Sequence, residues 1–248
     1  MSARPFFSVI IPSFNSGAAL EAAFHMLAAQ TETGFEVIVS DAGSTDGTLE
    51  LLEAESRFNL VWRSSPDGGI YDGMNKGIDQ ARGHWLLFLG ADDQLASAET
   101  LAHTRELLER TNLDIFSCAV RYTGKRNPLV PHIHTPVYGK RLRWKNTLHH
   151  QGTFYRATLF ASQRFDLRFP ILADYHFNLT CWKRGKLGEV HPNIVAMAGA
   201  QGISKGFKWA QYREELRVKQ DVFGWGERLL QTPWVWFKFV AKQLGRLT

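Results

Sequence analysis

Apolar runs and helical patterns alternate along the first half of the chain. The mostly apolar runs lie at 6–11, 35–40, 60–63, 84–89 and 113–120. Apolar residues at helical spacing fill the intervals, at 20–27, 46–57, 74–81 and 101–108. Continuous apolar runs are typical of strands buried on both faces, and their alternation with helices is typical of parallel sheets. The pattern therefore predicts an α/β fold with a mostly parallel central sheet and helices on both of its faces.

The pattern is weaker in the second half of the chain. Segment 124–139 contains three prolines and predicts a loop or a short hairpin, and a short strand is expected at 152–155. A further strand is expected at 186–197, where Pro192 removes a backbone donor from the middle. Because proline cannot donate to a neighbouring strand, this strand is predicted to lie at an edge of the sheet.

Glycine and proline predict where several helices begin and end. Gly83 should close the helix at 74–81, and Gly185 should close a helix at 173–184, since glycine is favoured just after a helix. Two helices are expected at the C-terminus. The second should begin at Thr232–Pro233, a favoured pair for the cap and first residue of a helix.

Composition narrows the class of protein. The 248 residues carry 29 Lys and Arg against 24 Asp and Glu, a net charge of +5, which indicates an anionic partner. Cys118 and Cys181 are the two cysteines, and their separation excludes a disulfide scaffold and a cysteine-based zinc site. No apolar stretch reaches the length of about 18 residues needed to span a bilayer, and we expect no signal peptide.

Carboxylates follow three of the predicted strands. Asp41 ends the second strand, Asp72 follows the third, and Asp92 and Asp93 follow the fourth. Because the carboxyl ends of parallel strands meet at one edge of a sheet, these residues should gather there. Their mutual repulsion is tolerable where a divalent cation lies among them, and adjacent carboxylates suit Mg²⁺ or Mn²⁺.

Each of these carboxylates also has a purely structural interpretation. Asp92 and Asp93 could form a turn and a helix cap. The glycine-rich turn after Asp41 could cap the next helix through Thr45 or Asp46. Asp41 itself, at the strand end, could accept a hydrogen bond from a nucleotide base or a ribose hydroxyl.

Four segments, IPSFN, VSDAGSTDGT, PDGGIYDGMNKG and LGADD, in this order and spacing, resemble family 2 glycosyltransferases. The resemblance implies the GT-A fold and a nucleotide-sugar-dependent, usually inverting, transferase. The segment GGIYDGMNKG, together with HHQGTFYR and LADYHFNLTCWKRG, resembles the bacterial exopolysaccharide branch of that family, which includes colanic-acid enzymes.

The resemblance implies a domain layout and several binding roles. Residues 1–203 would form the GT-A catalytic domain, with a nucleotide-sugar-binding half at 1–121 and an acceptor half at 122–203. The implied nucleotide-sugar-binding residues are Pro12, Ser13, Asp41, Asp72, Asn75 and Lys76, where Asp41 contacts the base. His150 and Gln151 would lie near the acceptor or the diphosphate.

The resemblance also implies a metal site and a catalytic base. The D-x-D metal motif of the family falls on residues 90–92, where Gly90 replaces the first acid, so Asp92 would hold Mg²⁺ or Mn²⁺ with help from Asp93. Asp174 matches the catalytic base of the family. An inverting transfer requires one carboxylate to take the proton of the acceptor hydroxyl. The alternative for Asp174 is an ordinary helix cap.

The C-terminal residues 204–248 combine basic and aromatic side chains. A first cationic face consists of Lys205, Lys208, Arg213, Arg217 and Lys219. The last segment carries Lys238, Lys242 and Arg246 as a narrow stripe beside a face rich in tryptophan. This pattern suits a helix in a membrane interface, and the alternative is a helix docked on the domain with its lysines in solvent.

The sequence therefore predicts a metal-dependent inverting glycosyltransferase of bacterial surface polysaccharide synthesis. The donor would be a nucleotide-diphosphate sugar, and the acceptor a glycan, such as one linked to undecaprenyl diphosphate. We expect a cytoplasmic protein at the inner face of the plasma membrane, with no nucleic-acid partner. The alternatives are a non-catalytic nucleotide-binding relative, favoured by Gly90, and a nucleotidyltransferase, disfavoured because residues 12–17 contain no Lys or Arg.

Overall fold

A computed structural model describes residues 4–124, 131–199 and 208–244. Its helices are α1 (Gly17–Ala28), α2 (Thr48–Ala54), α3 (Ile70–Gln80), α4 (Thr100–Leu108), α5 (Ala173–Lys183), α6 (Trp209–Phe223) and α7 (Trp225–Leu244). Its strands are β1 (Phe7–Ser13), β2 (Phe35–Asp41), β3 (Leu60–Ser64), β4 (Trp85–Phe88), β5 (Gln94–Leu95), β6 (Ile115–Thr123), β7 (Ile133–His134), β8 (Thr153–Arg156) and β9 (Gly188–Gly199). The predicted boundary at 203/204, Lys205 and Arg246 lie outside the described residues.

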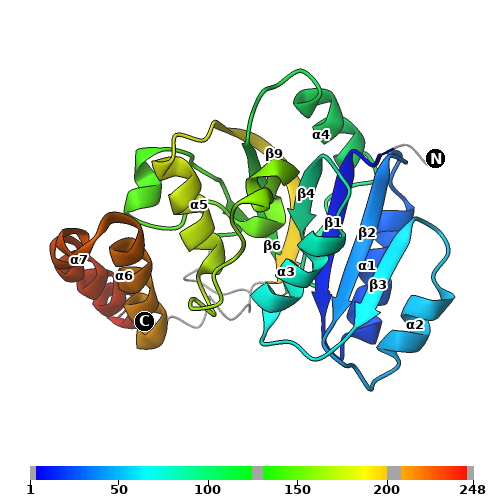
Figure 1. Ribbon diagram of the computed structural model, residues 1–248, viewed down its shortest axis with the longest axis horizontal. Helices are drawn as coiled ribbons and strands as arrows, with labels where there is room; N and C mark the ends of the chain where they lie inside the picture. Colours follow the sequence, from blue (N-terminus) through cyan, green and yellow to red (C-terminus); the bar gives the residue numbers. More distant parts are fainter. Residues whose placement is uncertain (1–3, 125–130, 200–207, 245–248) are drawn as a thin grey trace.

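The strands form one mixed sheet in the order β3-β2-β1-β4-β8-β6-β9-β5, with β7 paired to β6. The pairs from β3 to β4 are parallel, as predicted, and β8 runs antiparallel between β4 and β6. β6 and β9 therefore point in the same direction as β1 (Figure 1). The carboxyl ends of these strands meet at one edge, where the predicted site residues are concentrated.

Helices cover both faces of the sheet with separate apolar cores. On one face α1 and α4 pack through residues such as Phe24 and Leu101. On the other face α3 and α5 contribute Met74 and Phe177, and α6 contributes Val218. α6 thus shares the main core, whereas Val235 of α7 packs with Tyr212 and Leu216 of α6 in a small separate cluster. None of the described helices combines the length and apolar character needed to cross a bilayer.

Two expected helix ends were wrong. α3 stops at Gln80. Gly83 instead allows the backbone after α3 to pass close to β1, because an added Cβ would lie 2.5 Å from the Ser8 nitrogen. The last helix begins at Trp225, after Gly224 with φ +94°, and Pro233 lies inside it. Pro233 has no amide hydrogen to donate to the preceding turn, and the Thr232 hydroxyl donates to the Arg228 carbonyl beside it. Gly185, in contrast, follows α5 with φ +74° as expected.

β9 is an edge strand only where Pro192 lies. Its first half borders β6 alone, whereas Ala196 and Met197 also pair with β5. The register with β6 shifts between Cys118, opposite His191, and Ala119, opposite Ile194. The proline therefore occupies an irregularity that needs no donor from it.

Two lysines of the expected cationic surfaces turn inward, Lys219 of the first face and Lys238 of the stripe, whereas Arg213 and Arg217 are exposed. Lys219 is fully buried and donates to Glu215, Gln231 and the Trp144 carbonyl. Lys238 also turns inward and pairs with Glu215 at 2.5 Å. Both lysines hold α6, α7 and the segment before α5 together, because buried charges are stable only with such partners.

Candidate active site

A cavity of about 420 Å³ opens at the carboxyl ends of β1 and β2. Its lining residues are Pro12, Ser13, Phe14, Ala42, Pro66, Asp67, Gly69 and Ile70. The Ser13 hydroxyl is buried, and no described group hydrogen bonds to it. Because a buried hydroxyl without a partner is costly, this atom indicates a ligand with polar groups. Pro12 and Ser13 thus lie where the sequence placed the nucleotide.

Asp41 lies beside this cavity and is 2% exposed. Its carboxylate accepts hydrogen bonds from the Gly43 and Ser44 amides, both at 2.9 Å, and from the Ser64 hydroxyl at 2.7 Å. The Ser44 hydroxyl donates to its second oxygen. Burial opposes the charge, but these donors hold the pKa of Asp41 below its ordinary value. The glycine-rich turn therefore folds around an ionised Asp41.

Three residues of α3 that were expected near the diphosphate have mostly structural partners. Asp72 is half-buried and accepts from the Gly68 amide at 2.9 Å. Lys76 lies 3.9 Å from Asp72 and donates to the Pro66 carbonyl. Asn75 uses both ends of its amide on the backbone of Phe165. Asn75 therefore fixes the segment that leads to α5.

The carboxylates of Asp92 and Asp93 converge over Gly90. A Cβ on Gly90 would lie 2.9 Å from Asp93 Oδ2 and 3.1 Å from Asp92 Oδ1. Asp92 is exposed, whereas Asp93 is 2% exposed and accepts from the Gly90 amide at 2.6 Å. Burial, with the charge of Asp92, raises the pKa of Asp93. Because glycine replaces the first acid of the D-x-D motif, the carboxylates of Asp92 and Asp93 occupy the space that a side chain at position 90 would need.

Asp174 is the second residue of α5 and is 7% exposed. Its Oδ1 accepts from the Tyr71 hydroxyl at 3.1 Å and from the Tyr175 amide at 2.7 Å. Its Oδ2 lies 3.3 Å from Asn146 Nδ2 and 3.4 Å from His150 Nδ1. Three side chains from distant parts of the chain and one neighbouring amide therefore fix this carboxylate, which is more than a helix cap needs.

His150 and Gln151 connect the predicted base to the predicted metal ligands. His150 contacts Asp174, and His150 and Gln151 both lie close enough to Asp93 to act against the rise that burial causes in its pKa. The Nε2 atom of His150 is buried, and no described group hydrogen bonds to it. The structure thus brings Asp93, Gln151, His150 and Asp174 into one continuous cluster.

Tyr71 and Asn146 were not predicted as site residues. Burial and the charge of Asp174 raise the pKa of Tyr71 well above its ordinary value, so its hydroxyl keeps the proton that it donates. Tyr71 lies inside the motif GGIYDG, which was the available signal. Asn146 lies in a loop without a pattern, and the sequence offered no signal for it.

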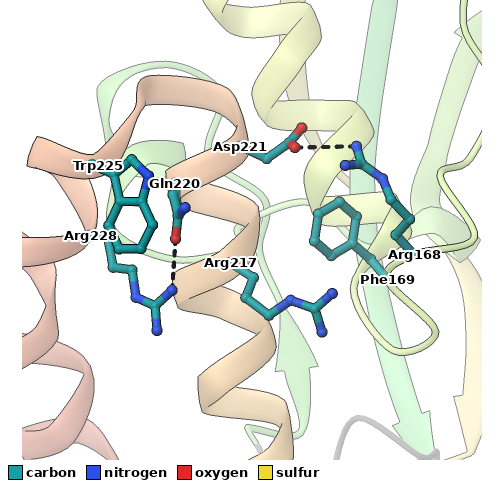
Figure 2. Close-up of a pocket in the computed structure, with 7 residues that line it drawn as sticks. All are labelled: Arg168, Phe169, Arg217, Gln220, Asp221, Trp225 and Arg228. Carbon is teal, nitrogen blue, oxygen red and sulfur yellow. Dashed lines mark hydrogen bonds and ion pairs between the residues drawn. The ribbon is translucent and has the colours of Figure 1, made fainter.

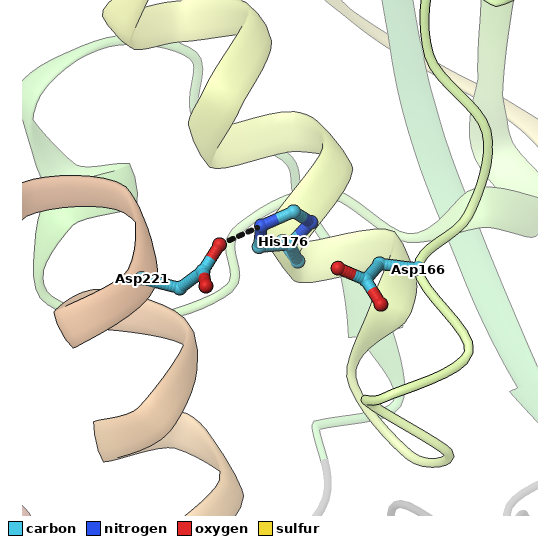
Figure 3. A group of neighbouring side chains, drawn as sticks. All are labelled: Asp166, His176 and Asp221. Atoms are coloured by element: carbon cyan, nitrogen blue, oxygen red, sulfur yellow. Dashed lines mark hydrogen bonds and ion pairs between the residues drawn. The ribbon is translucent and has the colours of Figure 1, made fainter.

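A second carboxylate–imidazole group lies on the other side of α5. Asp166, His176 and Asp221 each place a potential ligand atom within 4.8 Å of the others (Figure 3). Arg168 already pairs with Asp166 at 2.5 Å and with Asp221 at 3.2 Å. Because the guanidinium neutralises both carboxylates, this group is a structural ion-pair network.

The comparison with known families agrees with this geometry. Residues 8–174 match the model of glycosyl transferase family 2. The chain belongs to this family. The match runs from β1 to Asp174 and confirms the resemblance drawn from the sequence.

Individual relatives support the family and the fold. A PGL/p-HBAD biosynthesis glycosyltransferase of Mycobacterium bovis is 36% identical over 205 residues, which cover 78% of this chain and 76% of the relative. S. aureus TarS 1-349, solved with UDP-GlcNAc, superimposes with a TM-score of 0.70 at 23% identity, over 86% of this chain and 65% of that one. The mannosyltransferase PcManGT from Pyrobaculum calidifontis, solved with GDP-Man and Mn²⁺, has a TM-score of 0.66 at 18% identity, over 97% and 74%. The predicted GT-A fold is therefore confirmed.

Proposed function

We propose that this glycosyltransferase moves a sugar from a nucleotide-diphosphate donor to a hydroxyl of a lipid-linked glycan, with inversion at the anomeric carbon. The reaction would serve bacterial surface polysaccharide or glycolipid synthesis. The observation that carries the proposal is the placement of Asp174, a buried carboxylate held by four donors next to the predicted metal ligands.

The donor nucleotide fits the cavity lined by Pro12 and Ser13. The unpartnered Ser13 hydroxyl would bind the nucleotide, and Asp41 at the adjacent strand end would face the base. The N-terminal turn of α3, with Asp72, lies at the same opening and would approach the sugar. The structural relatives solved with UDP-GlcNAc and with GDP-Man support this class of donor.

The residues present fit a divalent cation. Asp92 and Asp93 are hard oxygen donors, and the pKa of Asp93 is raised by its burial and, to a lesser extent, by the charge of Asp92, both of which a cation would offset. Both would hold Mg²⁺ or Mn²⁺, and the bound ion would neutralise the charge of the departing diphosphate. The mannosyltransferase of similar fold, which was solved with Mn²⁺, supports this assignment.

Asp174 would act as the general base. Its carboxylate takes the proton from the acceptor hydroxyl while the acceptor oxygen bonds to the anomeric carbon. The bond from that carbon to the diphosphate breaks on the opposite face, so the configuration inverts. Tyr71, Asn146 and His150 keep the carboxylate oriented during this step.

A second cleft would give the acceptor a route to Asp174. Its volume is about 490 Å³, and its lining includes Asn146, which contacts Asp174. Its walls combine apolar and aromatic groups, such as Tyr175 and Phe237, with Lys145 and Lys242 and with the ion pair of Lys238 and Glu215. This combination suits an acceptor that carries phosphate and a hydrocarbon chain.

The Asp174→Asn variant tests the proposal. We expect the transfer rate to fall by about 10²- to 10⁴-fold, because the amide cannot take the proton. The shift in melting temperature caused by the donor nucleotide with Mn²⁺ should remain, since Asp174 lies outside the donor cavity. The control is Asp79→Asn, an exposed carboxylate on α3. If Asp174→Asn transferred sugar as fast as wild type, the assignment of Asp174 as the base would be wrong. The anomeric configuration of the product, compared with that of the donor, tests inversion.

A second candidate function is nucleotide binding without catalysis, which Gly90 favours because the family's first acid is absent. In that case, wild-type protein would show the nucleotide-dependent shift in melting temperature and no transfer from any donor tested.

The Asp92→Asn variant tests the metal assignment. If the Mn²⁺-dependent part of the shift in melting temperature is retained in this variant, the assignment of Asp92 as a metal ligand is wrong.

A further inference from the structure

Helix α7 has the opposite polarity to that of a helix docked on a soluble protein. Its outward side is apolar, with exposed fractions of 66% for Trp225, 72% for Leu229, 60% for Leu230, 59% for Trp236 and 58% for Phe237. A surface helix normally buries this side. Contiguous apolar exposure of this kind marks an interaction surface.

The polar side of α7 faces the protein. Glu227 is 6% exposed and pairs with Arg143 at 2.6 Å, and Gln231 is fully buried. Lys238 pairs with Glu215 of α6. These bonds fix the rotation of α7, so the helix cannot turn its apolar side inward without breaking a buried polar network. The apolar surface is therefore a permanent feature of the fold.

An arginine-lined pocket lies at the beginning of this apolar side. Its volume is about 510 Å³, and Figure 2 shows Arg168, Arg217 and Arg228 around it, together with Trp225. Arg168 pairs with Asp166 and with Asp221, and Asp221 also lines the pocket. Among the described residues, Arg217 has no carboxylate partner, and Arg228 donates to the neutral side chain of Gln220 at 2.7 Å. Two guanidinium charges are thus available to an anion.

We propose that α7 seats the enzyme on a negatively charged lipid bilayer. The apolar side of α7 enters the boundary between headgroups and acyl chains, where tryptophan is favoured, and the pocket of Arg217 and Arg228 binds a lipid phosphate. Trp225 belongs to both features, so the apolar surface and the anion pocket are continuous. A second copy of this chain is a poorer occupant, since it carries the same arginines and a net charge of +5.

Vesicle flotation with the full chain tests this membrane attachment. The test does not depend on the proposed sugar transfer. The probes are vesicles of phosphatidylcholine alone and of phosphatidylcholine with phosphatidylglycerol. We expect wild-type protein to float with the anionic vesicles and to dissociate from them as salt is raised. The double variant Leu229→Gln/Leu230→Gln should bind at least about tenfold more weakly, because two apolar side chains lose their burial.

The pocket is tested separately by Arg217→Gln/Arg228→Gln. We expect it to lose about tenfold or more in binding to anionic vesicles and little in binding to neutral ones. The matched control is Leu107→Gln/Arg110→Gln, with Leu107 at the end of α4 and Arg110 in the turn after it, which should float like wild type. Melting temperatures establish that every variant is folded.

Three outcomes would overturn the proposal. Wild-type protein could remain in the soluble fraction with anionic vesicles present. Both double variants could float as well as the control. Sedimentation could instead reveal a discrete dimer that Leu229→Gln/Leu230→Gln dissociates while vesicles bind nothing, which would assign the surface to a second copy. Transfer to a water-soluble acceptor, measured with the same variants, reports separately on the proposed function.

Discussion

Two buried carboxylates, Asp41 and Asp174, differ in the groups that surround them. Asp41 is enclosed by donors from its own turn and from Ser64 on the neighbouring strand β3. Asp174 accepts hydrogen bonds from Tyr71 of α3 and from Asn146 and His150 of one loop. The first arrangement stabilises a turn, and the second fixes the orientation of a single carboxylate.

Asp41 should make the fold sensitive to acid. Its folded pKa lies below the unfolded value of about 3.9, so its stabilisation is present above that pH and is lost as pH falls through the folded pKa. Asp41→Asn should lower the free energy of unfolding at pH 7 by about 2–3 kcal/mol, because hydrogen bonds to a charge are lost. The loss should shrink at about pH 3.

Urea unfolding of wild type and Asp41→Asn at both pH values checks this expectation. The exposed Asp79→Asn variant is the control and should change the free energy by less than about 0.5 kcal/mol. An equal effect of Asp41→Asn at both pH values would show that its charge does not stabilise the turn.

At this scale the sequence located the residues but not their partners. Strand ends and family motifs placed Ser13, Asp93 and Asp174 at one edge of the sheet, and the structure brings them there. The hydrogen bonds of Asn75 to Phe165 and of Asn146 to Asp174 join segments far apart in the chain. Such contacts depend on tertiary packing, which a local pattern does not encode.

Helix α3 illustrates how closely the elements pack. Gly77 faces β1, and an added Cβ would lie 2.4 Å from Ile10 Cγ2 and 3.2 Å from the Ser40 hydroxyl. Ile10 is fully buried and β-branched, so it cannot move aside easily. The helix can approach the sheet only because this position lacks a side chain.

Gly77→Ala should therefore destabilise the protein by about 1–3 kcal/mol through overpacking. The matched control is Gly226→Ala in α7, where an added Cβ meets no atom within 4 Å. That variant should be neutral or stabilising by up to about 1 kcal/mol, because alanine favours the helix. Thermal unfolding of both variants checks the pair, and equal melting temperatures would contradict the close packing.

Elements were predicted best where a strong period coincided with burial. The parallel strands β1 to β4 and helices α1, α3 and α5 follow directly from such patterns. The antiparallel insertion of β8 depends on a long-range pairing, which periodicity cannot specify. The start of α7 was misplaced because Thr232–Pro233 is a good local cap, whereas tertiary contacts of Glu227 and Gln231 extend the helix upstream.

At the scale of the whole molecule, the C-terminal helices support the active site. Glu214 of α6 is 6% exposed and accepts the amides of Ile171 and Leu172, at 2.8 and 2.7 Å. These amides immediately precede α5 and Asp174. Figure 1 shows α6 and α7 at the end of the molecule opposite β3 and α2, so this support acts on the half of the molecule that contains α5. The family match ends at residue 174, and this coupling was not predicted.

Glu214→Ala should lower kcat about tenfold or more, since a small displacement of the base is costly, and should leave donor binding unchanged. Glu214→Gln retains one acceptor oxygen and should restore much of the rate. Steady-state kinetics and nucleotide-dependent thermal shifts measure both. A loss of donor affinity equal to the loss of rate would indicate general unfolding rather than displacement of Asp174.

Tyr71 has a consequence for the order of events in a catalytic cycle. Gly69 and Ile70 line the nucleotide cavity, and the next residue hydrogen bonds to Asp174. A single helical turn thus links this cavity to Asp174. Under the proposed function, a donor that displaced the turn would also displace the phenol, and would so couple its own binding to the carboxylate proposed to deprotonate the acceptor.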